Sequence, residues 1–295
     1  MPKIILIILI IFSSLLNGQD LSEKYAFYGQ FLKLELKNAA FPHPDRKKGY
    51  DFKEHHFDFQ EHYKDSSVGV FIPKNYKSKN KINFVVHFHG WYNHIDSVLS
   101  TFQIIEQFAK SKVNAVLIIP QGAKNVPDSF GGKLEEKGGF QRFIDEILGG
   151  LNQRNINMPD SIGRIVLSGH SGAYRLISYI LLRGGLLPKI DEVYLFDAFY
   201  GHTEKYTYWL DNNEVRLINI FTKKGGTLEQ SQRLIEDLQG WGIEYSLIRN
   251  DNFAPDDLQQ NKIIFIESDL GHNQVIHANQ QFYKFLSSSS LPKIK

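Results

Sequence analysis

The 295-residue sequence contains no cysteine. This absence excludes disulfide bonds, a thiol nucleophile, thiolate metal ligands and lipid attachment through a cysteine. A chain without disulfides must be held together by its own hydrophobic core. The 42% of hydrophobic and 13% of aromatic residues are ample for such a core, and they exclude disorder for most of the chain.

The sequence also carries little net charge. Its 34 lysines and arginines nearly balance its 32 aspartates and glutamates, which leaves a formal charge of +2. The cations are scattered among the acids and form no basic stripe that could follow a phosphate backbone. A general electrostatic attraction to nucleic acid is therefore excluded.

The N-terminus carries an unbroken apolar stretch from Ile4 to Phe12, with Lys3 before it and the small residue Gly18 after it. This order is typical of a secretory signal peptide, and the stretch is short for a membrane span. The alternative is a buried first strand or helix. We expect residues 1–18 to be cleaved and the mature protein to be secreted or periplasmic, with no stable membrane insertion.

The remainder, residues 19–295, shows no linker and no internal repeat, which predicts a single domain. Apolar runs rich in β-branched residues predict parallel strands at 82–88, 115–120, 164–167, 192–196, 215–221 and 262–267. Amphipathic stretches predict helices at 98–110, 141–151, 174–182, 228–238 and 278–286. This alternation indicates an α/β fold with a mostly parallel central sheet and helices on both faces.

Two further features are a predicted pair of strands before this series and a short connection within it. Alternation at 56–59 and the apolar run at 68–73 predict an antiparallel pair of strands. The stretch between 196 and 215 is too short for a large lid, so we expect a minimal lid or none, and an open site.

The motif Gly-His-Ser-Gly-Ala, residues 169–173, lies between a predicted strand and a predicted helix. A serine between small residues in such a turn is the context of a nucleophile elbow. Serine is a weak nucleophile and needs a base to take its proton. The alternative is a serine that only caps the helix. Ser171 is therefore the candidate nucleophile.

The candidate base is His272, in the loop between the strand at 262–267 and the last helix. A base late in the chain, after the last strand, has the order that a Ser-Asp-His triad requires. A loop histidine without a role is one alternative. His277, five residues further on, is the other candidate base.

The acid of such a triad should end a strand between the serine and the histidine, and it holds the imidazole in the required tautomer. Asp197 ends the strand at 192–196, whereas residues 222–227, after the following strand, contain no acid. Asp197 is therefore favoured. The alternatives are Asp251, Asp256, Asp257 and Asp269, of which the last is expected to form a turn.

An oxyanion hole needs two backbone N–H groups directed at the developing negative charge. We expect one from Gly172, directly after the serine. The other should come from Trp91 or Tyr92, because a His89-Gly90 pair after the strand at 82–88 lets the backbone turn towards the site.

Aromatic residues at strand ends favour an apolar or ring-bearing acyl group, although each could instead belong to the core. The residues expected to bind substrate are His89, Gly90, Trp91, Tyr92, His170, Phe199 and Tyr200. His87, His89 and His94 also suggest a zinc site, since a strand places positions 87 and 89 on one face. No Asp or Glu accompanies them closely, so we expect no metal and no cofactor.

Taken together, these motifs resemble the α/β-hydrolase superfamily over residues 55–288. The segments 118–122 and 129–132, Ile-Ile-Pro-Gln-Gly and Ser-Phe-Gly-Gly, are similar to its secreted esterase and polyhydroxyalkanoate-depolymerase-like branch. The resemblance implies an acyl-enzyme on Ser171 that water, activated by His272, hydrolyses. This sequence departs from the usual pattern in having Ala173 in place of a glycine, and in having its acid at Asp197, one strand earlier.

The sequence therefore predicts a secreted serine hydrolase that acts on a small-molecule or polymeric ester or peptide. A peptidase or amidase of the same fold is one alternative, because ester and amide hydrolysis share one machinery. A binding protein that kept the fold without the chemistry is the other.

Overall fold

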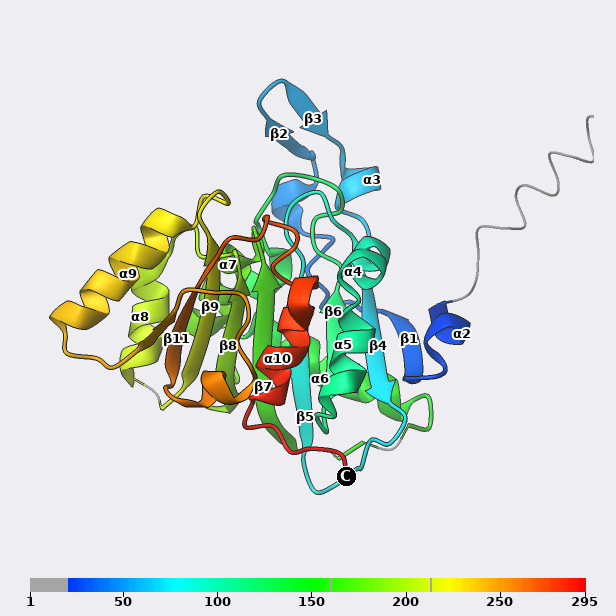
Figure 1. The fold of residues 1–295 in the computed structure, drawn as a ribbon. Coiled ribbons are helices and arrows are strands. Elements are labelled where there is room, and N and C mark those ends of the chain that lie inside the picture. Colours follow the sequence, from blue (N-terminus) through cyan, green and yellow to red (C-terminus); the bar gives the residue numbers. More distant parts are fainter. Residues whose placement is uncertain (1–20, 157, 160, 213) are drawn as a thin grey trace, which may run out of the picture.

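The computed structural model describes residues 21–156, 158–159, 161–212 and 214–295, so the predicted signal peptide lies outside the described residues. Nine strands of this part form one sheet (Figure 1). In spatial order they are β1 (Gly29–Glu35), β4 (Ser67–Pro73), β6 (Val116–Pro120), β5 (Ile82–Phe88), β7 (Ile162–His170), β8 (Ile190–Phe196), β9 (Arg216–Thr222), β11 (Ile263–Ser268) and β10 (Ser246–Ile248).

The strands from β6 to β10 in this order are parallel to their neighbours, whereas β4 runs antiparallel to both β1 and β6. Parallel neighbours need a crossover connection, and helices supply it here. The mostly parallel sheet predicted from the sequence is therefore confirmed.

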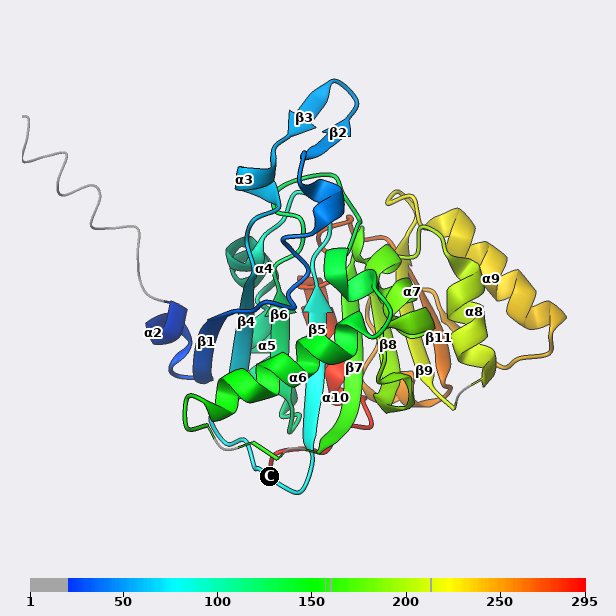
Figure 2. The ribbon, with the colours of Figure 1, turned by 180° about the vertical axis from the view of Figure 1, so that it is seen from behind.

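Helices cover both faces of the sheet (Figures 1 and 2). One face carries α4 (Ile95–Phe102), α5 (Ile104–Ser111) and α10 (Gln281–Ser287), with Tyr25 of α2 (Leu21–Tyr25) in the same core. The other face carries α6 (Gly139–Asn152), α7 (Ala173–Arg183), α8 (Thr203–Asn212) and α9 (Leu228–Gly240). The short helices are η1 (Pro44–Arg46), α3 (Phe59–His62), η2 (Gly132–Glu135), η3 (Leu187–Lys189), η4 (Asp256–Gln259) and η5 (Ala278–Gln280).

Each central strand contributes to two separate cores. In β5, Val86 belongs to the core under α6 and α7, whereas Val85 belongs to the core under α5 and α10. Ile118 and Ile119 of β6 divide in the same way. Successive side chains of a strand point to opposite faces, so a strand covered on both faces must be apolar throughout. The unbroken apolar runs of the sequence follow from this.

The helical segments differ from the prediction in two places. The helix expected at 98–110 is divided into α4 and α5 by Gln103, whose φ of 50° is left-handed. Helix α8 was not predicted, because its sequence carries no strong apolar stripe. It buries Tyr206 and Trp209 against the core on its face of the sheet.

The predicted antiparallel pair at 56–59 and 68–73 is wrong. β3 (His55–Phe57) pairs instead with β2 (Tyr50–Phe52), and the resulting hairpin projects from the body of the molecule (Figures 1 and 2). β4 pairs with β1, an edge strand. Only two of the seven β1 residues are buried, so its apolar pattern is too weak to read from the sequence.

Candidate active site

The candidate site lies where loops leave the carboxyl ends of the parallel strands. Ser171 follows β7, Asp197 follows β8 and His272 lies beyond β11, while residues 89–92 follow β5. Ligands bind at this edge of open α/β sheets, because successive loops meet there.

Ser171 occupies a strained turn between β7 and α7. Its φ of 54° lies in the left-handed region, which is costly for a residue with a Cβ atom. Two glycines make room for this turn. A Cβ atom on Gly90 would lie 2.5 Å from the Cβ of Ser171, and one on Gly172 would lie 2.5 Å from Cδ1 of Trp91. The loop after β5 can therefore approach the serine closely.

His272 and Asp197, 75 residues apart in the chain, are joined by a hydrogen bond. The Nδ1 atom of His272 lies 2.6 Å from Oδ2 of Asp197. The carboxylate is fully buried, whereas the side chain of His272 is 33% exposed. This pair fixes one nitrogen of the ring and leaves the other directed away from the acid.

The loop after β9 holds the Asp197 carboxylate. The backbone N–H of Thr222 donates to Oδ1 at 3.0 Å, its hydroxyl donates to Oδ2 at 2.9 Å, and the Thr227 hydroxyl donates to Oδ1. Burial alone would raise the pKa of this carboxyl, but the hydrogen bonds from His272, Thr227 and Thr222 hold it below its usual value. A Cβ atom on Gly225 would lie 1.8 Å from Oδ2, so the loop closes tightly on the acid.

A cavity of about 590 Å³ opens beside Ser171 and His272. Its wall is largely aromatic, which is typical of small-molecule sites. The lining residues are Trp91, Tyr92, Asn93, Thr101, Phe102, Ser129, His170, Ser171, Gly172, Tyr174, Tyr200, His272 and Asn273.

Of the three N–H groups considered for an oxyanion hole, one is already used. The N–H of Tyr92 donates to the carbonyl of Val126 at 3.1 Å. Within the described residues, the N–H groups of Trp91 and Gly172 donate to no protein acceptor. Tyr92 is therefore removed as a candidate donor, although its side chain lines the cavity.

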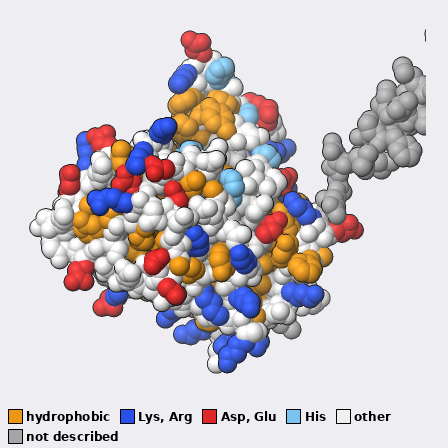
Figure 3. Space-filling model, in the orientation of Figure 1, with side chains coloured by type: hydrophobic (Ala, Val, Ile, Leu, Met, Phe, Trp, Pro, Cys, Tyr) orange, Lys and Arg blue, Asp and Glu red, His pale blue; other side chains and the backbone are white. Residues whose placement is uncertain are grey.

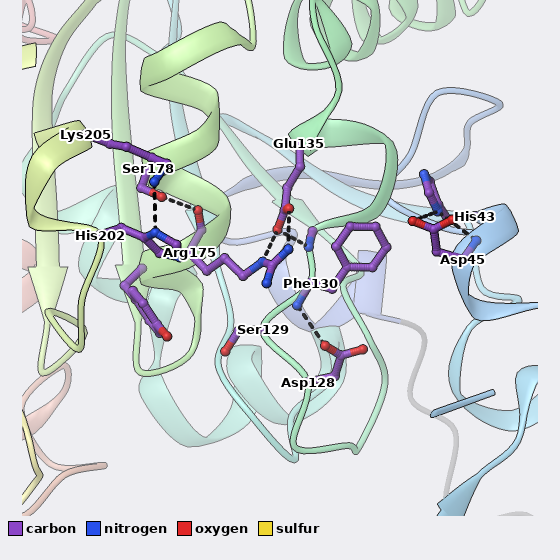
Figure 4. A network of polar contacts seen from close by, with 12 residues as sticks. His43, Asp45, Asp128, Ser129, Phe130, Glu135, Arg175, Ser178, His202 and Lys205 are labelled. Carbon is purple, nitrogen blue, oxygen red and sulfur yellow. Dashed lines mark hydrogen bonds and ion pairs between the residues drawn. The ribbon is translucent and has the colours of Figure 1, made fainter. Parts of the chain in front are cut away.

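The indole of Trp91 is held by the loop after β6. Its Nε1–H donates to the Ser129 hydroxyl at 2.8 Å. Figure 4 shows the ion pair of Glu135 and Arg175 in the same region as Ser129. Arg175 of α7 binds both oxygens of Glu135, at 2.9 and 3.0 Å, and thereby ties this loop to the helix that begins after Ser171.

Two predicted substrate-binding histidines have structural partners. His170 donates from Nε2 to the carbonyl of His272 at 3.0 Å, and its ring lies tilted against that of His272, with centroids 4.6 Å apart. It therefore lines the cavity and also supports His272. His89 accepts a hydrogen bond from the N–H of Gly122 at its Nε2 and therefore donates from Nδ1 to the carbonyl of Gly90. His89 joins two loops and does not line the cavity.

Two further predictions for substrate binding need correction. Phe199 is fully buried and packs against Tyr206, because the chain turns into the core after β8. Gly90 lies against Ser171 and does not line the cavity. Tyr200, next to Phe199, does line it and faces the ring of His272.

The alternative residues have other surroundings. Asp251 accepts from Ser268, and Asp269 pairs with Lys223, while Asp256 and Asp257 are exposed. His277 stacks on Phe102 and does not line the cavity. Among the described residues, the only group of three side chains placed to share a metal ion is Asp58, Glu61 and His62, so His87, His89 and His94 are not brought together.

Sequence reasoning missed the residues that support the site. Thr222, Gly225 and Thr227 lie in a loop that contains no acid, and Ser129 stands out in the sequence only as part of the Ser-Phe-Gly-Gly segment. A threonine carries no signal of its own for contacting a carboxylate 25 or 30 residues away.

The similarity of this chain to known proteins is limited to the fold. No protein family and no curated protein sequence matches the chain. A mutant feruloyl esterase module from Clostridium thermocellum, complexed with sinapinate, is 10% identical over 88% of this chain and 89% of that chain, with a TM-score of 0.52. A ferulic acid esterase is 13% identical over 75% of this chain and 91% of that chain, with a TM-score of 0.52.

A third solved structure is FphF, a fluorophosphonate-binding serine hydrolase from Staphylococcus aureus with substrate bound. It is 13% identical over 88% of this chain and 98% of that chain, with a TM-score of 0.51. The chain has the α/β-hydrolase fold. Within this fold, the narrower resemblance to the depolymerase-like branch remains a prediction.

Two buried histidines of this α/β-hydrolase fold, together with the partly buried His89, predict a loss of stability in mild acid. Burial lowers the pKa of His87 and of His170 to about 3, and that of His89 to about 4. These values lie below the ordinary histidine pKa, so the unfolded chain binds protons first as the pH falls. Stability is complete above about pH 6.5 and decreases towards pH 4, by up to about 1.4 kcal/mol per pH unit for each histidine.

Urea unfolding followed by circular dichroism between pH 7.5 and 4.5 measures this slope. The slope of the free energy of unfolding against pH is proportional to the number of protons taken up on unfolding. We expect His87→Gln to lower this number by about one while the slope keeps its sign. A free energy of unfolding that stays constant over this range would contradict the prediction.

Proposed function

We propose that the protein is a serine hydrolase that cleaves an ester bond through an acyl-enzyme on Ser171. The observation that carries this proposal is the hydrogen bond between His272 and buried Asp197, at the wall of the cavity that Ser171 also lines. A strained serine, an oriented imidazole and a buried carboxylate at the ends of three strands form the set of groups that acyl transfer needs.

In the first step, Oγ of Ser171 attacks the acyl carbon while Nε2 of His272 takes its proton. The imidazolium then gives this proton to the departing alcohol oxygen, which leaves the acyl group on Ser171. Water enters, His272 takes one of its protons, and the hydroxide oxygen attacks the acyl carbon. Release of the acid returns the proton to Ser171, so every step uses groups of the chain and water alone.

The negative charge on the carbonyl oxygen is stabilised by the N–H groups of Gly172 and Trp91. Neither donates to a protein acceptor in the described part of the chain, so both are available for the oxyanion. The close approach permitted by Gly90 brings Trp91 beside the serine. Asp197 stabilises the imidazolium that forms at His272 and keeps the Nδ1 proton in place.

Two observations guide the choice of substrate. Solved structures that share this fold include a feruloyl esterase module and a ferulic acid esterase, which favours an ester over an amide. The cavity is lined by aromatic side chains, among them Phe102, Tyr174 and Tyr200. A small-molecule ester with an apolar or ring-bearing acyl group fits this wall.

Ser171→Ala should abolish hydrolysis of p-nitrophenyl esters while the protein remains folded, because the variant lacks the hydroxyl that carries the acyl intermediate. A fluorophosphonate probe should label the wild-type protein and fail to label the variant. Substantial ester hydrolysis by the purified variant would overturn the assignment of the nucleophile.

One substitution of the acid and one of a glycine in contact with it should lower kcat and leave the fold intact. Asp197→Asn should reduce kcat by roughly 10⁴-fold, because an amide can donate to Nδ1 and then leaves the proton on Nε2, where it blocks the base. Gly225→Ala should reduce kcat by about 100-fold, because the new Cβ atom displaces the Asp197 carboxylate.

Matched controls separate these effects from general damage. Asp269→Asn changes an exposed carboxylate that pairs with Lys223, and Gly240→Ala adds a Cβ atom where no atom lies within 4 Å. Both should keep wild-type kcat. Wild-type turnover in Asp197→Asn would move the role of the acid to another residue.

We also propose that residues 1–18 form a cleaved signal peptide that precedes one catalytic domain, residues 19–295. No helix in the described part of the chain is long and apolar enough to cross a membrane. Expression with the native N-terminus should give an active protein outside the cytoplasm whose first residue, by N-terminal sequencing, lies near position 19. An active protein that keeps Pro2 would argue against cleavage.

A further inference from the structure

The hairpin of β2 and β3 stands at the mouth of the candidate site. Its Phe52 ring lies edge-on to Trp91, with ring centroids 5.6 Å apart, and Trp91 lines the cavity. Figure 3 shows hydrophobic side chains gathered on this projecting part of the molecule, below charged and histidine side chains at its tip.

Phe52 is placed differently from its aromatic neighbours on the hairpin. Tyr50 and Phe57 pack against the hydrophobic core, whereas the ring of Phe52 contacts Tyr50 and Trp91 and remains partly exposed. Trp91 is itself 39% exposed, and its neighbour Tyr92 is 58% exposed. An exposed apolar surface that continues out of a cavity is typical of a surface that a ligand covers.

The root of the hairpin is rigidly attached. Arg46, just before β2, binds both oxygens of Asp128, with Nε at 2.7 Å and Nη2 at 3.2 Å. Tyr63, after the hairpin, donates to the same carboxylate at 3.0 Å. The guanidinium of Arg46 also lies over the rings of Tyr50 and Phe130. Both ends of the segment that carries the hairpin therefore meet at one buried acid.

The same loop holds both partners of the Phe52–Trp91 contact. Asp128 anchors the hairpin, and the next residue, Ser129, accepts the hydrogen bond from the Trp91 indole. The distance between the two rings is thus set by adjacent residues of one loop. A contact fixed in this way can select among ligands, because a fixed wall does not adapt to the ligand's shape.

From this arrangement we infer that Phe52 is a specificity-determining residue, which extends the Trp91 wall and binds the apolar part of a substrate that reaches out of the cavity. The inference rests on the proposed function. A substrate small enough to stay within the cavity does not reach Phe52. Substitution of this residue should therefore slow the hydrolysis of large esters and leave that of small esters unchanged.

The test compares kcat and KM of Phe52→Ala and wild type on three esters. p-Nitrophenyl acetate is the small reference, p-nitrophenyl 3-phenylpropionate extends the acyl side, and 1-naphthyl acetate extends the alcohol side. We expect kcat/KM to fall by about tenfold, mainly through KM, for at least one of the larger esters. The value for p-nitrophenyl acetate should change less than twofold.

A second variant tests the anchor without removing the ring. Arg46→Lys keeps the charge but loses the two-pronged contact with Asp128, so the hairpin is held less firmly and the same selective loss should follow. Phe27→Ala, at a 79% exposed ring that packs on Tyr28, is the control for the phenylalanine. Arg142→Lys, at an exposed pair with Glu136, is the control for the arginine. Circular dichroism establishes that each variant is folded.

An equal change for all three esters, or no change for any, would overturn the inference even where Ser171→Ala abolishes every activity. Activity that survives Ser171→Ala would instead overturn the proposed function. The two failures are therefore distinguishable.

Discussion

The burial of one carboxylate governs the arrangement of the site. Asp197 is fully buried, and its charge is costly in the interior unless hydrogen bonds replace the lost water. Among the described residues, no lysine or arginine does so: the acceptor positions are filled by two threonine hydroxyls, one backbone N–H and the imidazole of His272. An acid satisfied by neutral donors keeps its negative charge available to an imidazolium, whereas a lysine or arginine beside it would compete for that charge.

This requirement explains why the loop after β9 matters although it contains no acid. The Thr222 backbone and the Thr227 hydroxyl hold Oδ1 of Asp197, and Gly225 approaches Oδ2, the oxygen that also binds His272. The acid ends β8, whose two neighbours in the sheet are β7, which leads to Ser171, and β9, whose loop supports the carboxylate. The order of strands thus decides which loop supports the acid.

The sheet holds the candidate catalytic residues in position, and the loops form the entrance of the cavity. Both faces of the sheet are covered by apolar cores, so the carboxyl ends of β5, β7, β8 and β11 are held in place from both sides. The hairpin, by contrast, projects from the body and is attached at its root, by Arg46 and Tyr63 on Asp128 and by the packing of Tyr50 and Phe57 on the core. An element attached at its root can differ in length and composition without disturbing the groups at the strand ends.

The sequence by itself determined the layered fold, because burial on both faces of a parallel strand leaves an apolar run that is visible without any structure. It also singled out Ser171, Asp197 and His272, since each follows a recognisable strand. The tertiary structure decided the rest. The hydrogen bond of Tyr92 to Val126, the burial of Phe199 and the support of Asp197 by Thr222 depend on how distant loops meet, and no local pattern records that. The hairpin pairing was misread for the same reason, because the partner of an edge strand is chosen by the whole sheet and not by the segment next to it in the chain.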